Sequence, residues 1–243
     1  MASPPSILVV DDERDICQNL ADILQEFGFE VETALDGESA IEMIRRRRFD
    51  VALLDLKMPV MDGLALYKAI REERPSIVSM IVTAYANAQT NREALQAGVW
   101  QVISKPVDLK QLLALVDDAV KQPILMVVDD DIDLCKSLWD ILRDHGYRVC
   151  TALTDQEAIR RLGESQFQVV LVDLKLAPGD GRNVLEALRR QAPETKAILI
   201  TGHPTELENS FQSSVAPDAV CLKPFDMVQL LETINRLVQD RSH

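Results

Sequence analysis

Residues 51–63, VALLDLKMPVMDG, contain the feature that decides the fold of this chain. Four apolar residues lead into Asp55, and Pro59 and Asp62-Gly63 follow, which are typical of a turn. The pattern predicts a buried strand that ends at an acidic residue. A buried carboxylate is unfavourable unless other groups pair with it, and the carboxyl edge of an open α/β sheet is a common ligand site. We therefore expect other polar residues of the chain to meet Asp55.

The composition is that of a globular protein large enough for two ordinary domains. The chain has 243 residues, of which 47% are hydrophobic, and a formal net charge of −13. This charge disfavours direct nucleic-acid binding, which depends on Lys and Arg neutralising phosphates. No apolar run approaches the roughly 18 residues of a membrane span, and the first residues lack the features of a signal peptide. We expect a cytoplasmic protein that makes no membrane contact and whose partners are proteins.

The four cysteines are expected to be reduced thiols of the core. Cys17, Cys135, Cys150 and Cys221 show no C-x-x-C spacing, and each lies in a segment with apolar periodicity. This distribution does not favour disulfides or a zinc site.

The sequence contains an internal repeat. Asp55 aligns with Asp173 and Lys105 with Lys223, since 173−55 and 223−105 both equal 118. One domain fold is therefore present twice, and we place the boundary so that the domains are residues 1–121 and 122–243. The same offset aligns three further pairs without a gap: Asp11 with Asp129, Asp12 with Asp130 and Thr83 with Thr201.

Within each half, the hydrophobic periods alternate between strand and helix. Near-continuous apolar strands separated by amphipathic helices predict a parallel sheet that is covered on both faces. The second half repeats the pattern of the first, so we predict an α/β protein with two doubly wound (βα)5 sheets in tandem. The strands of the first half are expected at residues 7–10, from 31, 51–54, 77–82 and 99–103, and its helices at residues 16–27, 40–44, 64–70, 89–97 and 109–120.

Such a sheet brings polar residues from four strand ends to one edge. Asp11 and Asp12 stand at the end of the first strand, Thr83 at the end of the fourth and Lys105 at the end of the fifth. Carboxylates this close repel one another unless a cation joins them, and Mg²⁺ prefers oxygen ligands. With the ammonium and the hydroxyl as further stabilising groups, the cluster suits phosphoryl transfer onto Asp55.

Each half resembles a receiver domain of the bacterial two-component response regulators. The resemblance extends from VVDDE to KPVDLKQLL in the first half and from VVDDD to KPFDMVQLL in the second. It implies a flavodoxin-like strand order, 2-1-3-4-5, and phosphate donation by a histidine kinase or phosphotransfer protein. It also implies a regulatory protein rather than an enzyme, which assists its own Mg²⁺-dependent phosphorylation and dephosphorylation.

The expected function is that of a tandem receiver which relays phosphate and signals to a downstream protein partner by contact. Receivers commonly dimerise through the face made by helix 4, strand 5 and helix 5, so a homodimer through that face is a further expectation. The alternative is that the chain is a receiver fragment of a larger hybrid histidine kinase or effector protein.

The resemblance assigns roles to individual residues. Asp55 and Asp173 would accept the phosphoryl group. Lys57 and Lys175 would offer their backbone carbonyls to Mg²⁺, which the acceptors would also contact. The other expected metal ligands are Asp12 and Asp130, which would bind directly, and Asp11 and Asp129, which would act largely through water. The residues expected to stabilise the phosphoryl group are Lys105 and Lys223, which would pair with it, and Thr83 and Thr201, which would turn towards it on activation.

The chain departs from the family pattern at several positions. Val102 and Val220 stand where receivers commonly carry a Tyr or Phe that moves with the threonine. Either the signal passes through helix 4 and its loop alone, or phosphorylation changes the output face weakly. His203 follows Thr201, and it either tunes the loss of phosphate or is simply a solvated loop residue.

Two tryptophans and an arginine run also require interpretation. Trp100 either anchors a protein partner, or lies across its own fourth helix or against the second domain. Trp139 has the helical spacing of a residue that packs in the core or between the domains. The arginines at residues 45–48 are interpreted as the solvated end of the second helix, where cations complement the helix dipole.

Overall fold

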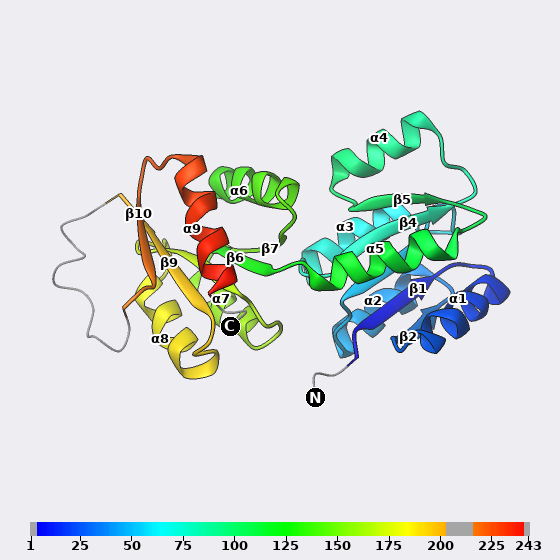
Figure 1. The fold of residues 1–243 in the computed structure, drawn as a ribbon, viewed down its shortest axis with the longest axis horizontal. Helices are drawn as coiled ribbons and strands as arrows, with labels where there is room; N and C mark the ends of the chain where they lie inside the picture. Colours follow the sequence, from blue (N-terminus) through cyan, green and yellow to red (C-terminus); the bar gives the residue numbers. More distant parts are fainter. Residues whose placement is uncertain (1–3, 203–215, 241–243) are drawn as a thin grey trace. The chain divides into compact units, whose positions relative to one another are not determined.

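The structure is a computed structural model in which residues 4–202 and 216–240 are described. The chain divides into two compact units, Met1–Gln122 and Pro123–His243. In Figure 1 each unit is a sheet with helices packed on it. None of the described helices combines the length and the hydrophobicity needed to cross a bilayer.

The first unit contains a five-stranded parallel sheet in the order β2-β1-β3-β4-β5. This order confirms the predicted flavodoxin-like arrangement. The observed ends differ from the expected ones by one or two residues for most elements, as is usual for pattern-based bounds. The strands are β1 (Ser6–Val10), β2 (Glu30–Ala34), β3 (Val51–Asp55), β4 (Val78–Thr83) and β5 (Gln101–Ser104), and the helices are α1 (Arg14–Glu26), α2 (Gly37–Arg46), α3 (Gly63–Glu73), α4 (Ala88–Ala97) and α5 (Leu109–Lys121).

The second unit repeats this topology with the order β7-β6-β8-β9-β10, which is 2-1-3-4-5 when counted within the unit. The repeat predicts a helix at residues 207–215, and these residues lie outside the described part of the chain. The strands are β6 (Ile124–Val128), β7 (Arg148–Ala152), β8 (Val169–Asp173), β9 (Lys196–Thr201) and β10 (Ala219–Leu222), and the described helices are α6 (Ile132–Asp144), α7 (Asp155–Leu162), α8 (Gly181–Gln191) and α9 (Met227–Gln239).

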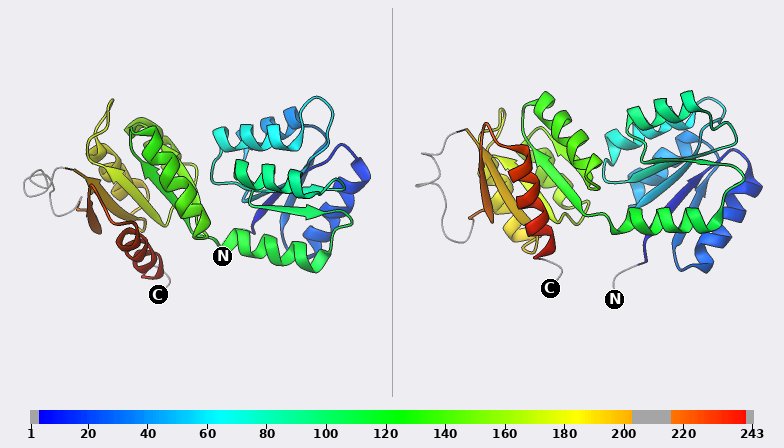
Figure 2. Two further views of the ribbon diagram at one scale, coloured as in Figure 1. Left: turned by 90° about the horizontal axis from the view of Figure 1, so that it is seen from above. Right: turned by 45° about the horizontal axis from the view of Figure 1, so that its top comes forward.

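Helices cover both faces of each sheet (Figure 2). In the first unit, buried side chains of α1 and α5 form one core with the sheet, and those of α2, α3 and α4 form the other. In the second unit, α6 and α9 share one core, and α7 and α8 share the other. Burial on both faces explains why the strands are continuous apolar runs rather than alternating ones.

The central strand β3 shows this arrangement residue by residue. Val51 and Leu53 point into the core under α1 and α5, whereas Ala52 and Leu54 point into the core under α2, α3 and α4. All four side chains are at most 1% exposed. Successive side chains of a strand point to opposite faces, so a polar residue anywhere in this run would lie in a core.

A close turn connects each central strand to the following helix. Asp62 caps α3 by accepting a hydrogen bond from the Ala65 amide at 2.7 Å. A Cβ atom on Gly63 would lie 2.2 Å from the carbonyl oxygen of Asp55, and one on Gly181 would lie 2.0 Å from that of Asp173. Only glycine allows the helix to begin this close to the acidic strand end.

The apex of the first of these turns is conformationally strained. Val60 has a φ of +67°, a left-handed conformation that β-branched residues rarely adopt. Its side chain is fully exposed, so no packing compensates the strain. Val60 therefore lowers the stability of the first unit.

We predict that Val60→Asn raises the free energy of unfolding of the first unit by about 1 kcal/mol, because Asn tolerates the left-handed region. The measurement is chemical denaturation followed by circular dichroism. Val60→Thr keeps the β-branched side chain and is the control, with stability close to the wild type. A Val60→Asn protein no more stable than Val60→Thr would contradict the prediction.

Candidate functional site: a lysine between two carboxylates at each sheet edge

The register of the parallel strands determines which polar residues meet in the first unit. Val10 of β1 lies opposite Leu54 of β3, so the next residues, Asp11 and Asp55, are neighbours at the carboxyl edge. On the other side, β4 ends with Thr83 opposite Ser104 of β5, and Lys105 follows. These residues were expected at one edge of the sheet, and the register of the strands explains why they meet there.

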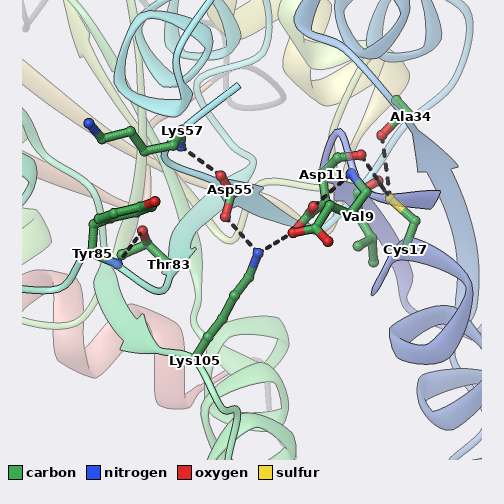
Figure 3. A network of polar contacts seen from close by, with 10 residues as sticks. Val9, Asp11, Cys17, Ala34, Asp55, Lys57, Thr83, Tyr85 and Lys105 are labelled. Carbon is green, nitrogen blue, oxygen red and sulfur yellow. Dashed lines mark hydrogen bonds and ion pairs between the residues drawn. The ribbon is translucent and has the colours of Figure 1, made fainter. Parts of the chain in front are cut away.

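Lys105 connects the two carboxylates (Figure 3). Its Nζ atom lies 2.6 Å from Asp11 Oδ2 and 2.7 Å from Asp55 Oδ1. Asp11 is 3% exposed and Asp55 is 7% exposed, so the ammonium compensates two carboxylates that are largely removed from water.

Backbone amides satisfy the other oxygens of these carboxylates. The Lys57 amide donates to Asp55 Oδ2 at 2.6 Å, and the Glu13 amide donates to Asp11 Oδ1 at 3.0 Å. Thr83 is completely buried, and its Oγ1 accepts a hydrogen bond from the Tyr85 amide at 3.1 Å. The hydroxyl is therefore held close to the backbone of the loop that follows β4 (Figure 3).

The second unit has the same arrangement. Lys223 Nζ lies 2.7 Å from Asp129 Oδ2 and 2.6 Å from Asp173 Oδ2. The Lys175 amide donates to Asp173 Oδ1 and the Asp131 amide to Asp129 Oδ1, both at 3.0 Å. Thr201 ends β9 and is completely buried, like Thr83.

The ion pairs raise the pKa values of both lysines. For Lys105, burial lowers the pKa, but the hydrogen bonds and charges of Asp11 and Asp55 outweigh burial, and the net shift is upward. The same balance, with Asp129 and Asp173 as the acids, raises the pKa of Lys223. Both ammonium groups are therefore firmly protonated at neutral pH.

The carboxylates of the second unit also form a group suited to a hard cation. Asp129, Asp130 and Asp173 each offer an oxygen, and these oxygens lie within 4.8 Å of one another. The described residues of the first unit show no group this close, although Asp11, Asp12 and Asp55 occupy the equivalent positions. Oxygen-only donors of this kind fit Mg²⁺, which takes carboxylates and carbonyls and retains water. Asp12 and Asp130 are exposed, as a direct ligand that meets an incoming ion would be.

Burial makes the charged form of Asp129 unfavourable. Desolvation raises the pKa of this carboxyl, and the hydrogen bonds and charge of Lys223 only partly offset it. A bound divalent cation would favour the ionised form in the same place.

One contact beside the first site was not predicted from the sequence. Lys57 Nζ lies over the ring of Tyr85, 5.1 Å from its centroid, so the residues two positions after Asp55 and Thr83 meet at one side of the site (Figure 3). Tyr85 is 59% exposed, and a cation–π contact at such a site contributes about 0.5–1 kcal/mol. The sequence contained one indication of this contact, because Lys57 and Tyr85 each stand two residues after a site residue.

The positions that depart from the family pattern differ between the units. Val102 is partly buried and packs on the core under α2, α3 and α4, whereas Val220 is 46% exposed. Neither can supply an aromatic ring. His203 lies outside the described residues, so both interpretations of it stay open.

The structure shows the surroundings of both tryptophans and of the arginine run. Trp100 packs on its own unit, partly buried against the core under α1 and α5 and not against the core that includes α4. Trp139 is buried, and its Nε1 donates to the Val149 carbonyl at 3.2 Å. Three arginines at the end of α2 form ion pairs with glutamates, as expected of a solvated helix end: Arg45 with Glu73, Arg46 with Glu42, and Arg47 with Glu30 and Glu32.

The cysteines are free thiols, as predicted. Burial raises the pKa to about 11 for Cys17 and to about 12 for Cys135 and Cys150, and it raises the pKa of the partly buried Cys221 as well. At neutral pH they are not thiolates and are poor nucleophiles or metal ligands.

Comparison with known proteins finds the same family in both halves of the chain. The family model of the response regulator receiver domain matches residues 7–117 and again residues 125–235. A response regulator receiver protein of Anaeromyxobacter sp. (strain Fw109-5) is 34% identical over 234 residues, which cover 96% of this chain and 95% of that protein. Among solved structures, a CheY-like receiver domain protein from Methanospirillum hungatei JF-1 aligns at 33% identity over 49% of this chain and 94% of its own, with a TM-score of 0.47.

Other relatives share only part of their length with this chain. The transcriptional regulatory protein ZraR of Escherichia coli O157:H7 is 40% identical over 114 residues, 47% of this chain and 26% of ZraR. The DNA-binding transcriptional regulator NtrC of Escherichia coli (strain K12) is 29% identical over 195 residues, 80% of this chain and 40% of NtrC.

The fold and the acidic site with its lysine define a regulatory domain of two-component signalling. The chain belongs to the response regulator receiver family and contains two receiver domains in tandem.

We predict that Asp129→Asn stabilises the second unit at pH 7 in the absence of divalent cations. The pKa of the Asp129 carboxyl is raised in the folded protein, so the folded protein binds the carboxyl proton more tightly than the unfolded protein does. Stability is therefore lost as the pH rises from the unfolded-state pKa through the folded-state pKa. Asparagine cannot ionise and avoids this loss. Denaturation at pH 7 and pH 3 measures the difference, which should be present at pH 7 and absent at pH 3. A variant less stable than the wild type at pH 7 would refute the prediction.

Proposed function

We propose that both halves accept a phosphoryl group from a phosphohistidine donor, on Asp55 in the first and on Asp173 in the second. The observation that carries the proposal is the lysine that lies within 2.7 Å of two buried carboxylates in each half. The donor is a histidine kinase or a phosphotransfer protein, and the signal leaves by contact with a downstream protein.

The reaction at Asp55 is a displacement at phosphorus. A carboxylate oxygen of Asp55 forms a bond to phosphorus as the bond from phosphorus to the donor imidazole nitrogen breaks, and the imidazole leaves with its electron pair. The product is an acyl phosphate: Asp55 loses its carboxylate charge, which the positive charge of the protonated phosphoimidazole balances as neutral imidazole leaves, and the phosphoryl oxygens keep their own negative charges. The ammonium of Lys105 then moves its contact from the Asp55 oxygen to those oxygens while it remains paired with Asp11.

The remaining residues stabilise charge at defined places. Thr83 is buried one strand away from Asp55 and supplies a hydroxyl donor for a phosphoryl oxygen once it leaves the Tyr85 amide. Mg²⁺, bound by Asp12, the acceptor and the Lys57 carbonyl, with Asp11 acting through water, would neutralise charge on the phosphoryl oxygens. In the second half the same tasks fall to Asp129, Asp130, Lys175, Thr201 and Lys223.

These roles make the chain a phosphoacceptor that assists its own phosphorylation and dephosphorylation, and not an enzyme with a separate substrate. We place the protein in the cytoplasm, where its donors reside, and we divide the receivers between residues 121 and 122.

We also assign a homodimer contact to the face of α4, β5 and α5. Sedimentation with and without a phosphodonor tests that contact, and a monomer in both states would exclude it.

The phosphoacceptor proposal predicts how many phosphates the protein takes up. With acetyl phosphate and Mg²⁺, intact mass should show up to two phosphates on the wild type, one on Asp55→Ala or Asp173→Ala, and none on the double variant. Asp117→Ala changes an exposed acid of α5 and is the control, with uptake equal to the wild type. A wild type without phosphate, or a double variant that retains phosphate, would contradict the proposal.

A further inference from the structure

The loop after each acceptor contacts the second helix of its unit, but the two units use opposite combinations of glycine and side chain at this contact. In the first unit, a Cβ atom on Gly37 would lie 2.6 Å from Met61 Sδ, so the Met61 side chain occupies the space beside the glycine. The repeat places Asp155 and Gly179 at the equivalent positions, since 155−37 and 179−61 both equal 118. In the second unit the helix therefore supplies the side chain and the loop supplies the glycine.

The fit of Asp155 against the loop is close. A Cβ atom on Gly179 would lie 2.5 Å from Asp155 Oδ1, and Gly179 has a φ of +122°, which only glycine adopts readily. Asp155 is the first residue of α7 and is 7% exposed. The carboxylate is thus enclosed between the start of α7 and the loop.

Both oxygens of the carboxylate accept hydrogen bonds in this position. Its Oδ2 accepts from Asn183 Nδ2 at 2.7 Å and from the Asp180 amide at 3.3 Å, and its Oδ1 accepts from the Gln156 amide at 2.8 Å. The hydrogen bond from Asn183, aided by the backbone amides, lowers the pKa of Asp155, so it is ionised at neutral pH. It connects three segments: the start of α7, the end of the loop and the first turn of α8.

The held end of the loop is linked directly to the acceptor. Lys175 and Asp180 pair as an isolated antiparallel bridge, and the Gly181 amide donates to the Leu174 carbonyl at 3.0 Å. The Lys175 amide in turn donates to Asp173 Oδ1 at 3.0 Å. A displacement of the loop at Asp180 would therefore be transmitted through one residue pair to the hydrogen bond on the acceptor.

We propose that Asp155 is a positioning residue of the second site, which holds the loop so that the Lys175 peptide keeps its orientation towards Asp173. The inference rests on the proposed role of Asp173 as a phosphoacceptor. Asn183 takes part as the donor that fixes the carboxylate. The first unit has Gly37 and Ala65 in these places and holds its loop with Met61, so the device belongs to the second site.

The test compares the two sites of one molecule. The 243-residue wild type, Asp155→Ala, Asn183→Ala and the double variant are treated with acetyl phosphate and Mg²⁺. The phosphate on Asp55 and on Asp173 is followed separately by peptide mass spectrometry. Residues that orient a ligand-bearing group typically contribute tenfold or more, so Asp155→Ala should slow phosphorylation of Asp173 about tenfold. The rate at Asp55 should not change.

The double variant distinguishes positioning from independent effects. Since Asn183 acts through Asp155, the double variant should be no slower at Asp173 than Asp155→Ala alone. Asn183→Ala replaces an exposed residue by alanine, the residue at the equivalent position 65 of the first unit. This variant is expected to fold, so it still tests the proposal if Asp155→Ala does not fold. An unchanged rate at Asp173 in either single variant, an equal loss at Asp55, or losses that multiply in the double variant would each overturn the positioning role.

Amide hydrogen exchange provides a measurement that does not depend on phosphorylation. In unphosphorylated Asp155→Ala without Mg²⁺, exchange should increase in residues 175–180 and stay unchanged in β8 and in residues 57–62. Unchanged exchange in residues 175–180 would overturn the proposal. A wild type that takes up no phosphate on Asp173 would instead refute the proposed function of the second site.

Discussion

Each half of this protein depends on one ammonium group that lies between two buried carboxylates. Removing the ammonium would leave two buried carboxylates with neither water nor a counter-ion, a change that typically costs about 3–5 kcal/mol. Lys105 and Lys223 satisfy two carboxylates each, and they do so only if the first, third and fifth strands of a unit end at the same edge. The parallel direction of the strands and the assembly of the site are therefore linked.

Much of this arrangement was predictable because it follows from local periodicity and topology. The apolar run of β3 requires burial on both faces, and a parallel sheet then collects strand ends, so Asp11, Asp55 and Lys105 were expected at one edge. The repeat supplied the same prediction for Asp129, Asp173 and Lys223. The roles given to these residues in phosphoryl transfer and in Mg²⁺ binding stay proposals.

The loops were not predictable to the same extent, because their geometry is set by contacts between segments distant in sequence. The strain at Val60 depends on the turn that Gly63 allows against the Asp55 carbonyl. In the first unit the helix carries the glycine and the loop the side chain (Gly37 and Met61), whereas in the second unit this is reversed (Asp155 and Gly179). The aligned sequences reveal this reversal only once the structure shows that the two positions are in contact. A repeat of one fold can therefore contain two sites with the same central charges and different supports.

The most direct test of this account identifies the acceptors chemically in the unmutated protein. Borohydride reduces an acyl phosphate to an alcohol, so an aspartyl phosphate is converted to homoserine at the residue that carried it. After treatment with acetyl phosphate and Mg²⁺, peptide sequencing by mass spectrometry should find homoserine at positions 55 and 173. Homoserine at other positions, or at neither of these, would contradict the claim that the lysine-paired aspartates are the phosphoacceptors.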